Sequence, residues 1–157
     1  MTHQRFNRFI RPYLEKEQQE GVEIFAVMRE PVSWLGSWYR YRQRAELVDT
    51  PNSTSGISFD EFVEAYLLPK NRPRYAQIGS QARLVSKSRH EVAVPHLFRY
   101  EDMPRVLDFL EARLGKRLQL PNRNVSPEME LALSPGILAQ LQQTHALDFE
   151  TYGAIGD

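Results

Sequence analysis

The stretch 24-IFAVMREPVSWLGSWYRYRQR-44 decides how this chain folds. An apolar run, residues 22 to 28, predicts a strand that is covered on both sides. The run ends at Arg29, and Pro31 follows two positions later. Proline favours the first turn of a helix, because its missing N–H has no intrahelical partner there. We therefore expect a strand, an arginine and then a helix that continues to about Arg44.

The place of Arg29 in this pattern suggests a phosphate-binding site. Ligands of open α/β sheets gather at the carboxyl ends of strands, and an arginine can bind a phosphate through two parallel hydrogen bonds. Ser33 and Ser37 are four residues apart, so their hydroxyls share one face of the predicted helix. The alternative is that Arg29 pairs with an acid such as Glu101, while the serines pack or face water. Spacing alone slightly favours this alternative.

Apolar periodicity and cap residues predict the remaining elements. The best-marked helix starts at Ser58, because Glu61 completes a capping box. We expect the other elements at these places: an N-terminal helix with one apolar face over 6–14, shortened by Pro12; a helix over 75–86; a second strand over 96–100; a helix from Pro104 that stops at Gly115; and a last helix capped by Ser134 that carries Leu138, Leu141 and Leu147.

Composition narrows the class of protein. The chain has 157 residues, 41% of them hydrophobic, with a formal net charge of +0, which fits one ordinary soluble domain. No apolar run is long enough to span a membrane, and the N-terminus is too polar for a secretory signal, so we expect a cytoplasmic protein. Disulfides and zinc-cysteine sites are excluded because cysteine is absent. The histidines share no metal-ligand spacing, so we expect no metal, and the balanced charge argues against nucleic acid.

Three segments resemble one enzyme superfamily. FAVMREPVSWLGSWYRY, residues 25–41, resembles the phosphate-binding segment of the sulfotransferases that use 3'-phosphoadenosine 5'-phosphosulfate (PAPS), including the arginine and a serine eight positions later. LFRYEDMPRVLDFLEARLG, residues 97–115, resembles their strand, Tyr-Glu-Asp element and helix. LPNRNVSP and LSPGILAQLQQTHALDFETY resemble the C-terminal pattern of several bacterial and carbohydrate-directed members, including Asp148, Phe149 and Tyr152. The similarity runs in order from about residue 22 onward.

The resemblance implies an α/β protein with a P-loop NTPase-like sulfotransferase fold, incomplete and helix-rich with a small parallel sheet. It implies that Arg29 and Ser37 bind the 3'-phosphate of PAPS, with Ser33 as a neighbour on the same face. The reaction would transfer a sulfuryl group from PAPS to a hydroxyl or amine of a small-molecule or carbohydrate acceptor.

Other site residues follow less directly. Gln81 and Arg123 are further candidates for contact with the nucleotide. Glu101 is interpreted as an architectural carboxylate that closes a strand. The catalytic base is unassigned; His3 is the candidate by residue type, although a surface histidine is the simpler interpretation.

One element of the family pattern is missing. Sulfotransferases bind the 5'-phosphosulfate with a P-loop-like segment before the arginine strand, whereas residues 1 to 21 contain one glycine, Gly21, and no such loop. We therefore expect residues 1–157 to form a single sulfotransferase-like domain without the first strand and that loop, with little or no activity by itself. The predicted strand over 22–28 would keep unpaired backbone groups, which favour a homodimer or a rearranged sheet.

Two other functions fit the same residues. The chain could be a non-catalytic domain that binds nucleotide or phosphate through Arg29 and Ser37. It could also be an interaction module, with protein preferred to nucleic acid as the partner, built on aromatic rings and guanidinium groups. The residues of that cluster are Trp34, Trp38, Tyr39, Arg40, Tyr41, Arg42 and Arg44.

Overall fold

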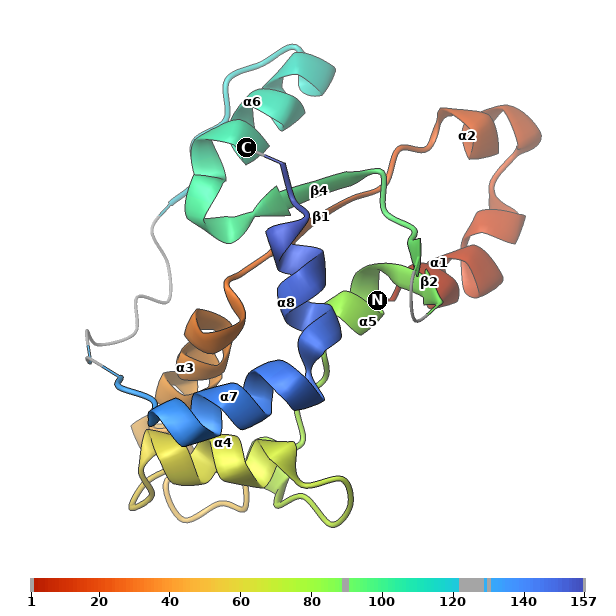
Figure 1. The fold of residues 1–157 in the computed structure, drawn as a ribbon. Coiled ribbons are helices and arrows are strands. Elements are labelled where there is room, and N and C mark those ends of the chain that lie inside the picture. Colours follow the sequence, from red (N-terminus) through yellow and green to blue (C-terminus); the bar gives the residue numbers. More distant parts are fainter. Residues whose placement is uncertain (1, 89–90, 122–128, 130, 157) are drawn as a thin grey trace. The chain divides into compact units, whose positions relative to one another are not determined.

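The computed structural model describes residues 2–88, 91–121, 129 and 131–156 of the chain. The chain divides into two compact units. Unit 1 comprises Met1–Glu30, Ser80–Leu118 and Leu147–Asp157, and unit 2 comprises Pro31–Gly79 and Gln119–Ala146. The expected mixed α/β, helix-rich architecture with a small parallel sheet is confirmed (Figure 1).

Unit 1 contains every strand among the described residues. Its elements are α1 (His3–Phe9), a 3₁₀ turn (Arg11–Tyr13), α2 (Lys16–Gly21), β1 (Phe25–Met28), α5 (Gln81–Val85), β2 (Ser86–Ser88), β3 (Glu91–Val92), β4 (His96–Arg99), a 3₁₀ turn (Tyr100–Asp102), α6 (Met103–Leu114) and, from Leu147 onward, α8 (Ala146–Gly153).

The central feature of unit 1 is the parallel pair β1–β4 (Figure 1). Its register runs from Phe25 opposite His96 to Met28 opposite Arg99. Both predicted strands are present, but β1 is shorter than residues 22 to 28 and is not covered on both sides. Phe25 is 42% exposed and only Met28 is fully buried. The segment before Phe25 stays outside the ladder, where polar contacts hold Glu23.

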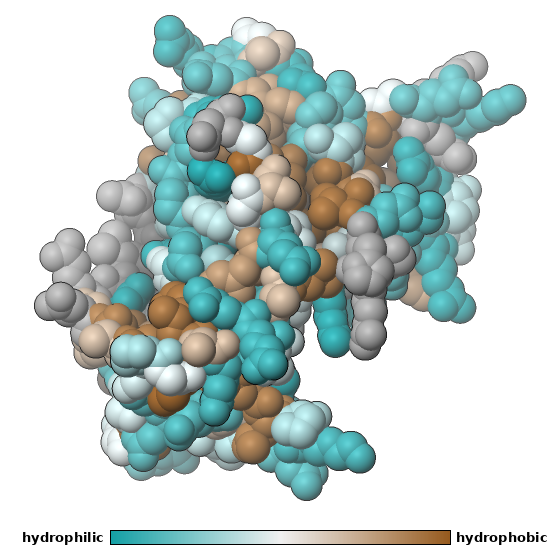
Figure 2. Space-filling model, in the orientation of Figure 1, coloured by the Kyte–Doolittle hydropathy of each residue, from teal (hydrophilic) through white to brown (hydrophobic). Residues whose placement is uncertain are grey.

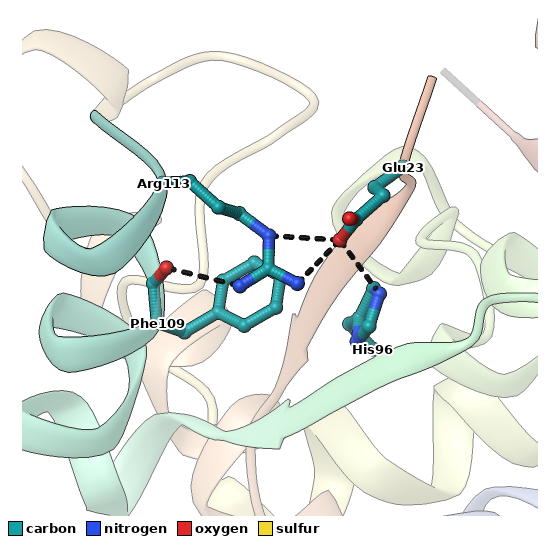
Figure 3. A network of polar contacts seen from close by, with 4 residues as sticks. All are labelled: Glu23, His96, Phe109 and Arg113. Atoms are coloured by element: carbon teal, nitrogen blue, oxygen red, sulfur yellow. Dashed lines mark hydrogen bonds and ion pairs between the residues drawn. The ribbon is translucent and has the colours of Figure 1, made fainter. Parts of the chain in front are cut away.

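Those polar contacts tie the start of β1 to β4 and α6 (Figure 3). Glu23 accepts hydrogen bonds from Nε of Arg113, at 2.8 Å, and from its Nη2. His96 Nε2 lies 3.0 Å from the same carboxylate oxygen. The guanidinium of Arg113 also lies over the Phe109 ring, 3.5 Å from its centroid. We call Glu23, His96, Phe109 and Arg113 the amino-end network.

The core of unit 1 joins β1, the segment around β2 and β3, and the end of the chain. Its buried residues are Met28, Val85, Val94 and Ile155, and Ile24, Ala26, Leu97 and Tyr152 pack against them. Two arginines hold the chain end in place: Arg99 donates to the carbonyl of Ile155 at 2.8 Å, and Arg105 donates to that of Gly156 at 2.6 Å. The C-terminal residues are therefore part of this core.

The N-terminal helix differs from its prediction. It stops at Phe9, and a 3₁₀ turn contains Pro12, so the expected shortening is confirmed. Its apolar face is not buried, since the exposed fractions are 54% for Phe9, 40% for Ile10 and 87% for Tyr13. Thr2 caps its first turn by accepting from the Arg5 amide at 3.1 Å, and Gln4 donates to the Lys87 carbonyl at 2.9 Å.

Unit 2 is helical within the described residues. Its elements are α3 (Pro31–Tyr41), α4 (Phe59–Leu67), α7 (Pro135–Thr144) and 3₁₀ turns at Ala45–Leu47 and Arg74–Ala76. α4 starts as predicted: Ser58 accepts from the amide of Glu61 at 3.2 Å, and Glu61 accepts from that of Ser58 at 2.6 Å. The core contains Leu35, Tyr39, Phe59, Phe62, Val63, Tyr66, Ala76 and Leu141.

Three further predictions need correction. The helix expected over 75–86 is divided into a 3₁₀ turn and the short α5, which begins only after Ser80 caps it. The last helix ends at Thr144, and α8 starts two residues later. Ser134 occupies the N-cap position of α7, but its hydroxyl donates to Asp60 and makes no cap hydrogen bond.

The surface mixes hydrophilic side chains with hydrophobic ones (Figure 2). In the part of the chain that the structure describes, each helix is too short or too polar to cross a membrane. The same residues include no group of three or more His, Asp or Glu side chains arranged to hold a metal ion.

Candidate functional site

Arg29 directly follows β1, at the carboxyl end of the parallel pair, as the sequence predicts. Its main chain is held by one side chain, that of Gln81 at the start of α5. The Arg29 amide donates to Gln81 Oε1 at 2.9 Å, and Gln81 Nε2 donates to the Arg29 carbonyl at 2.8 Å. The carboxamide therefore continues the hydrogen bonding of the strand one residue beyond the β1–β4 ladder.

The guanidinium of Arg29 lies over an aromatic ring. Its central carbon is 4.8 Å from the ring centroid of Tyr100, the residue that follows β4. Cation–π contacts of partly exposed groups contribute about 0.5–1 kcal/mol. The Tyr100 ring covers one flat face of the guanidinium, and the N–H groups lie in the plane of the guanidinium.

Glu101 occupies a structural position at the same end of the sheet. One carboxylate oxygen accepts from the Glu30 amide at 3.1 Å, and the other accepts from the Tyr152 hydroxyl at 2.9 Å. Burial raises the pKa of Tyr152, and the hydrogen bond to Glu101 raises it further. These contacts agree with an architectural carboxylate that closes the strand end.

A second carboxylate, Asp148 of α8, fixes the start of α5. It is 5% exposed, and its Oδ1 accepts from the Ala82 amide at 2.7 Å and from the Ser80 hydroxyl at 3.0 Å. A carboxylate at this place satisfies amide donors that lack a partner within the helix. Gln81 lies between Ser80 and Ala82 in the sequence. Asp148 therefore also fixes the position from which the Gln81 side chain reaches Arg29.

Ser33 and Ser37 lie on α3, and each is half-buried. Their spacing of four residues in a continuous helix puts them on one face, as expected. α3 belongs to unit 2 and Arg29 belongs to unit 1. Their joint action on one phosphate therefore stays a prediction that rests on the sequence resemblance.

The remaining candidates have different outcomes. Arg123 lies outside the described residues. The ring of His3, the first residue of α1, has its Nε2 3.1 Å from the Asn7 amide nitrogen, and the Asn7 Oδ1 accepts from Arg11 at 3.2 Å. These local contacts give His3 no partner on the β1–β4 pair, and its assignment as a base stays untested.

In the aromatic and arginine cluster of unit 2, several side chains contact one another. Trp34 packs edge-on against Trp38 and against the buried Tyr66, with centroids 6.4 Å apart in both pairs. Arg42 lies over the Trp38 ring, and Arg44 lies over that of Tyr41, at 5.3 and 4.8 Å. Two of the rings that could stack on nucleic-acid bases, Trp38 and Tyr41, thus have cationic partners within the unit.

Sequence reasoning missed how the end of β1 is held. Gln81 is only a candidate for nucleotide contact by sequence, and the structure shows that its amide oxygen and nitrogen both bond to the main chain of Arg29. Asp148 and Tyr152 were noted only as parts of a family pattern. The available signal was their spacing of four residues, which puts a carboxylate and a phenol on one face of a helix.

Comparisons of the chain with protein-family models, curated proteins and solved structures find no match. The geometry of the described residues and the resemblance in the sequence are therefore the basis for any function.

Proposed function

We propose that this chain is a sulfotransferase-like domain that binds the adenosine 3',5'-bisphosphate part of PAPS, with Arg29 as the principal ligand of the 3'-phosphate. The observation that supports it most is the placement of Arg29 at the carboxyl end of the parallel β1–β4 pair. This is where ligands of α/β sheets bind. Ser37 supplies a second hydrogen bond in this proposal, and Ser33 is its neighbour on α3.

The chemistry of the ligand suits an arginine held by its main chain. A phosphate monoester carries close to two negative charges at neutral pH and accepts several hydrogen bonds. A guanidinium can donate two of them in parallel, and the Tyr100 ring beneath it limits the orientations that the side chain can adopt. Less conformational freedom is then lost when the phosphate binds.

In the complete reaction, the acceptor oxygen or nitrogen would form a bond to sulfur. The bond from sulfur to the 5'-phosphate oxygen would break, and its electron pair would remain on the adenosine 3',5'-bisphosphate. A base would take the acceptor proton, and no described residue is assigned that role. The functional proposal therefore concerns binding of the nucleotide, and catalysis by this chain is not part of it.

Calorimetric titration of the whole chain with adenosine 3',5'-bisphosphate tests the proposal. We expect Arg29→Ala to weaken binding by about 1.5–3 kcal/mol, which is about 10- to 150-fold in Kd, because a hydrogen-bonded charge contact is lost. Ser37→Ala should weaken it by about 1 kcal/mol. Adenosine 5'-monophosphate, which lacks the 3'-phosphate, should bind weakly to the wild type and be insensitive to Arg29→Ala.

Arg83→Ala is the matched control. Arg83 is an exposed arginine of the same unit, and its hydrogen bond to Ser80 uses the main-chain amide. This variant should bind like the wild type. Equal losses in Arg29→Ala and Arg83→Ala would indicate nonspecific attraction between charges, and no binding by the wild type would overturn the proposal.

The alternative, a non-catalytic domain that recognises the phosphate group and not the nucleoside, rests on the same residues. It is distinguished by the ligand: inorganic phosphate or pyrophosphate should then bind about as tightly as the adenosine bisphosphate.

A further inference from the structure

Helix α8 reaches the end of β1 through two separate chains of hydrogen bonds. The first runs from Asp148 to Ser80 and Ala82, and from Gln81 between them to the main chain of Arg29. The second runs from Tyr152 to Glu101 and on to the amide of Glu30. The two chains thus end on consecutive residues, Arg29 and Glu30.

Burial makes the first series of hydrogen bonds rigid. Asp148 is 5% exposed and Gln81 is 7% exposed, so water competes little for their hydrogen bonds. Gln81 contacts both the N–H and the C=O of Arg29, which fixes the peptide planes on either side of its Cα atom. The direction of the Cα–Cβ bond, and with it the base of the arginine side chain, is then set by α5 and α8.

The second series of hydrogen bonds acts on the Glu30 amide. Glu101 holds the Glu30 amide with one oxygen and the Tyr152 hydroxyl with the other. The Tyr152 ring packs on the core formed by Met28, Val85, Val94 and Ile155. The guanidinium of Arg99 lies 5.4 Å from its centroid. The phenol therefore packs on the core with its ring and donates its hydroxyl to the Glu101 carboxylate.

We propose that Gln81 and Tyr152 are positioning residues that fix the backbone at Arg29 and so set its affinity for the 3'-phosphate. This inference rests on the proposed function. It assigns to the C-terminal helix a part in ligand binding without any contact between that helix and the ligand.

The test combines two variants with a double-mutant cycle. Gln81→Met keeps the length of the side chain and removes both hydrogen bonds to Arg29, and Tyr152→Phe removes only the hydroxyl. We expect the affinity for adenosine 3',5'-bisphosphate to fall on the order of tenfold in the first variant and about threefold in the second. The affinity for adenosine 5'-monophosphate should not change in either.

The decisive measurement is the effect of Gln81→Met in a chain that already carries Arg29→Ala. A residue that acts through Arg29 should have no further effect there, whereas a general structural defect would add to the first loss. Gln4→Met and Tyr13→Phe are matched controls in unit 1. Gln4 bonds to the carbonyl of Lys87, and Tyr13 is 87% exposed. Both variants should bind like the wild type.

The outcomes separate the two proposals. If Arg29→Ala leaves the affinity unchanged, the proposed function fails. If Arg29→Ala weakens binding but Gln81→Met and Tyr152→Phe do not, the function stands and the positioning role is wrong. If the losses add in the double variant, the positioning role is also wrong. Should Gln81→Met lower the melting temperature so far that it is not folded at 25 °C, Tyr152→Phe alone decides in the same cycle.

Discussion

At the scale of single residues, carboxylates hold the described structure together at several points. Glu23, Asp60 and Glu61 all have a pKa below the ordinary value, in each case chiefly because a hydrogen bond is donated to the ionised form. The donors differ: a guanidinium for Glu23, a hydroxyl for Asp60 and a backbone amide for Glu61. In each case folding is favoured by ionisation of the acid.

The amino-end network gives a pH-dependent prediction. The pKa of Glu23 is lower in the folded chain than its ordinary value of 4.5, mainly because of Arg113. Its contribution to stability is thus present above pH 4.5 and disappears as the pH falls through the lowered pKa. We expect Glu23→Gln to lower the melting temperature slightly at pH 7, and this difference to shrink toward pH 3.

Circular dichroism across this pH range measures the effect. Glu46→Gln, at an exposed glutamate of unit 2, serves as the control for a change of net charge. An unchanged gap between Glu23→Gln and the wild type at pH 3 would show that the network acts through packing and not through charge.

At the scale of elements, sequence prediction works where the signal is local. The capping box of α4 and Gly115, which ends α6 in the left-handed region at φ 64°, both depend on residues within one turn. The β2–β3 ribbon was missed because Ser86–Ser88 is a polar Ser-Lys-Ser segment without strand propensity. The apolar face of α1 was wrongly expected to be buried. Apolar periodicity predicts that one face of a helix is hydrophobic, but it does not show whether another element packs against that face.

The same distinction between local and long-range signals applies to the candidate site. Arg29 could be predicted because strand, arginine and proline are adjacent in sequence. Its hydrogen bonds to Gln81 join residues 52 positions apart, and those between Glu30 and Glu101 join residues 71 apart. No single-sequence pattern specifies such pairs, because they depend on where α5 and β4 lie in the folded unit.

α4 provides a prediction about a single cap. Ser58→Ala removes the side-chain acceptor of the Glu61 amide, and we expect it to lower the free energy of unfolding by about 1 kcal/mol. Ser55→Ala is the control, because Ser55 is exposed and its hydrogen bond to Ser53 uses the main-chain amide. Urea denaturation measures both; equal stabilities of the two variants would contradict the capping role.

At the scale of the whole molecule, both units are discontinuous in sequence. The chain leaves unit 1 after Glu30 and again after Leu118, and it returns each time. Neither unit can therefore be obtained by cutting the chain at one point, and the experiments above use the full 157 residues.

The homodimer, which the sequence suggests beside a rearranged sheet, stays a prediction. Among the described residues, β1 pairs with β4 alone, so its outer edge has backbone groups that another strand could bind. We expect sedimentation to give a dimeric mass at micromolar concentration. Phe25→Glu, which places a charge on β1, should shift the mass to that of a monomer, whereas Val92→Glu, at a similarly exposed residue of β3, should not. A monomeric mass for the wild type at every concentration would contradict the prediction.

The long separation between β1 and β4 has a consequence for synthesis of the protein. Phe25 pairs with His96, 71 residues later. At the usual speed of a ribosome, the partner strand is made about 4 to 14 seconds after β1. During that interval β1 has no β4 to pair with. Slower synthesis between the two strands would therefore lengthen the time that β1 spends without its partner strand.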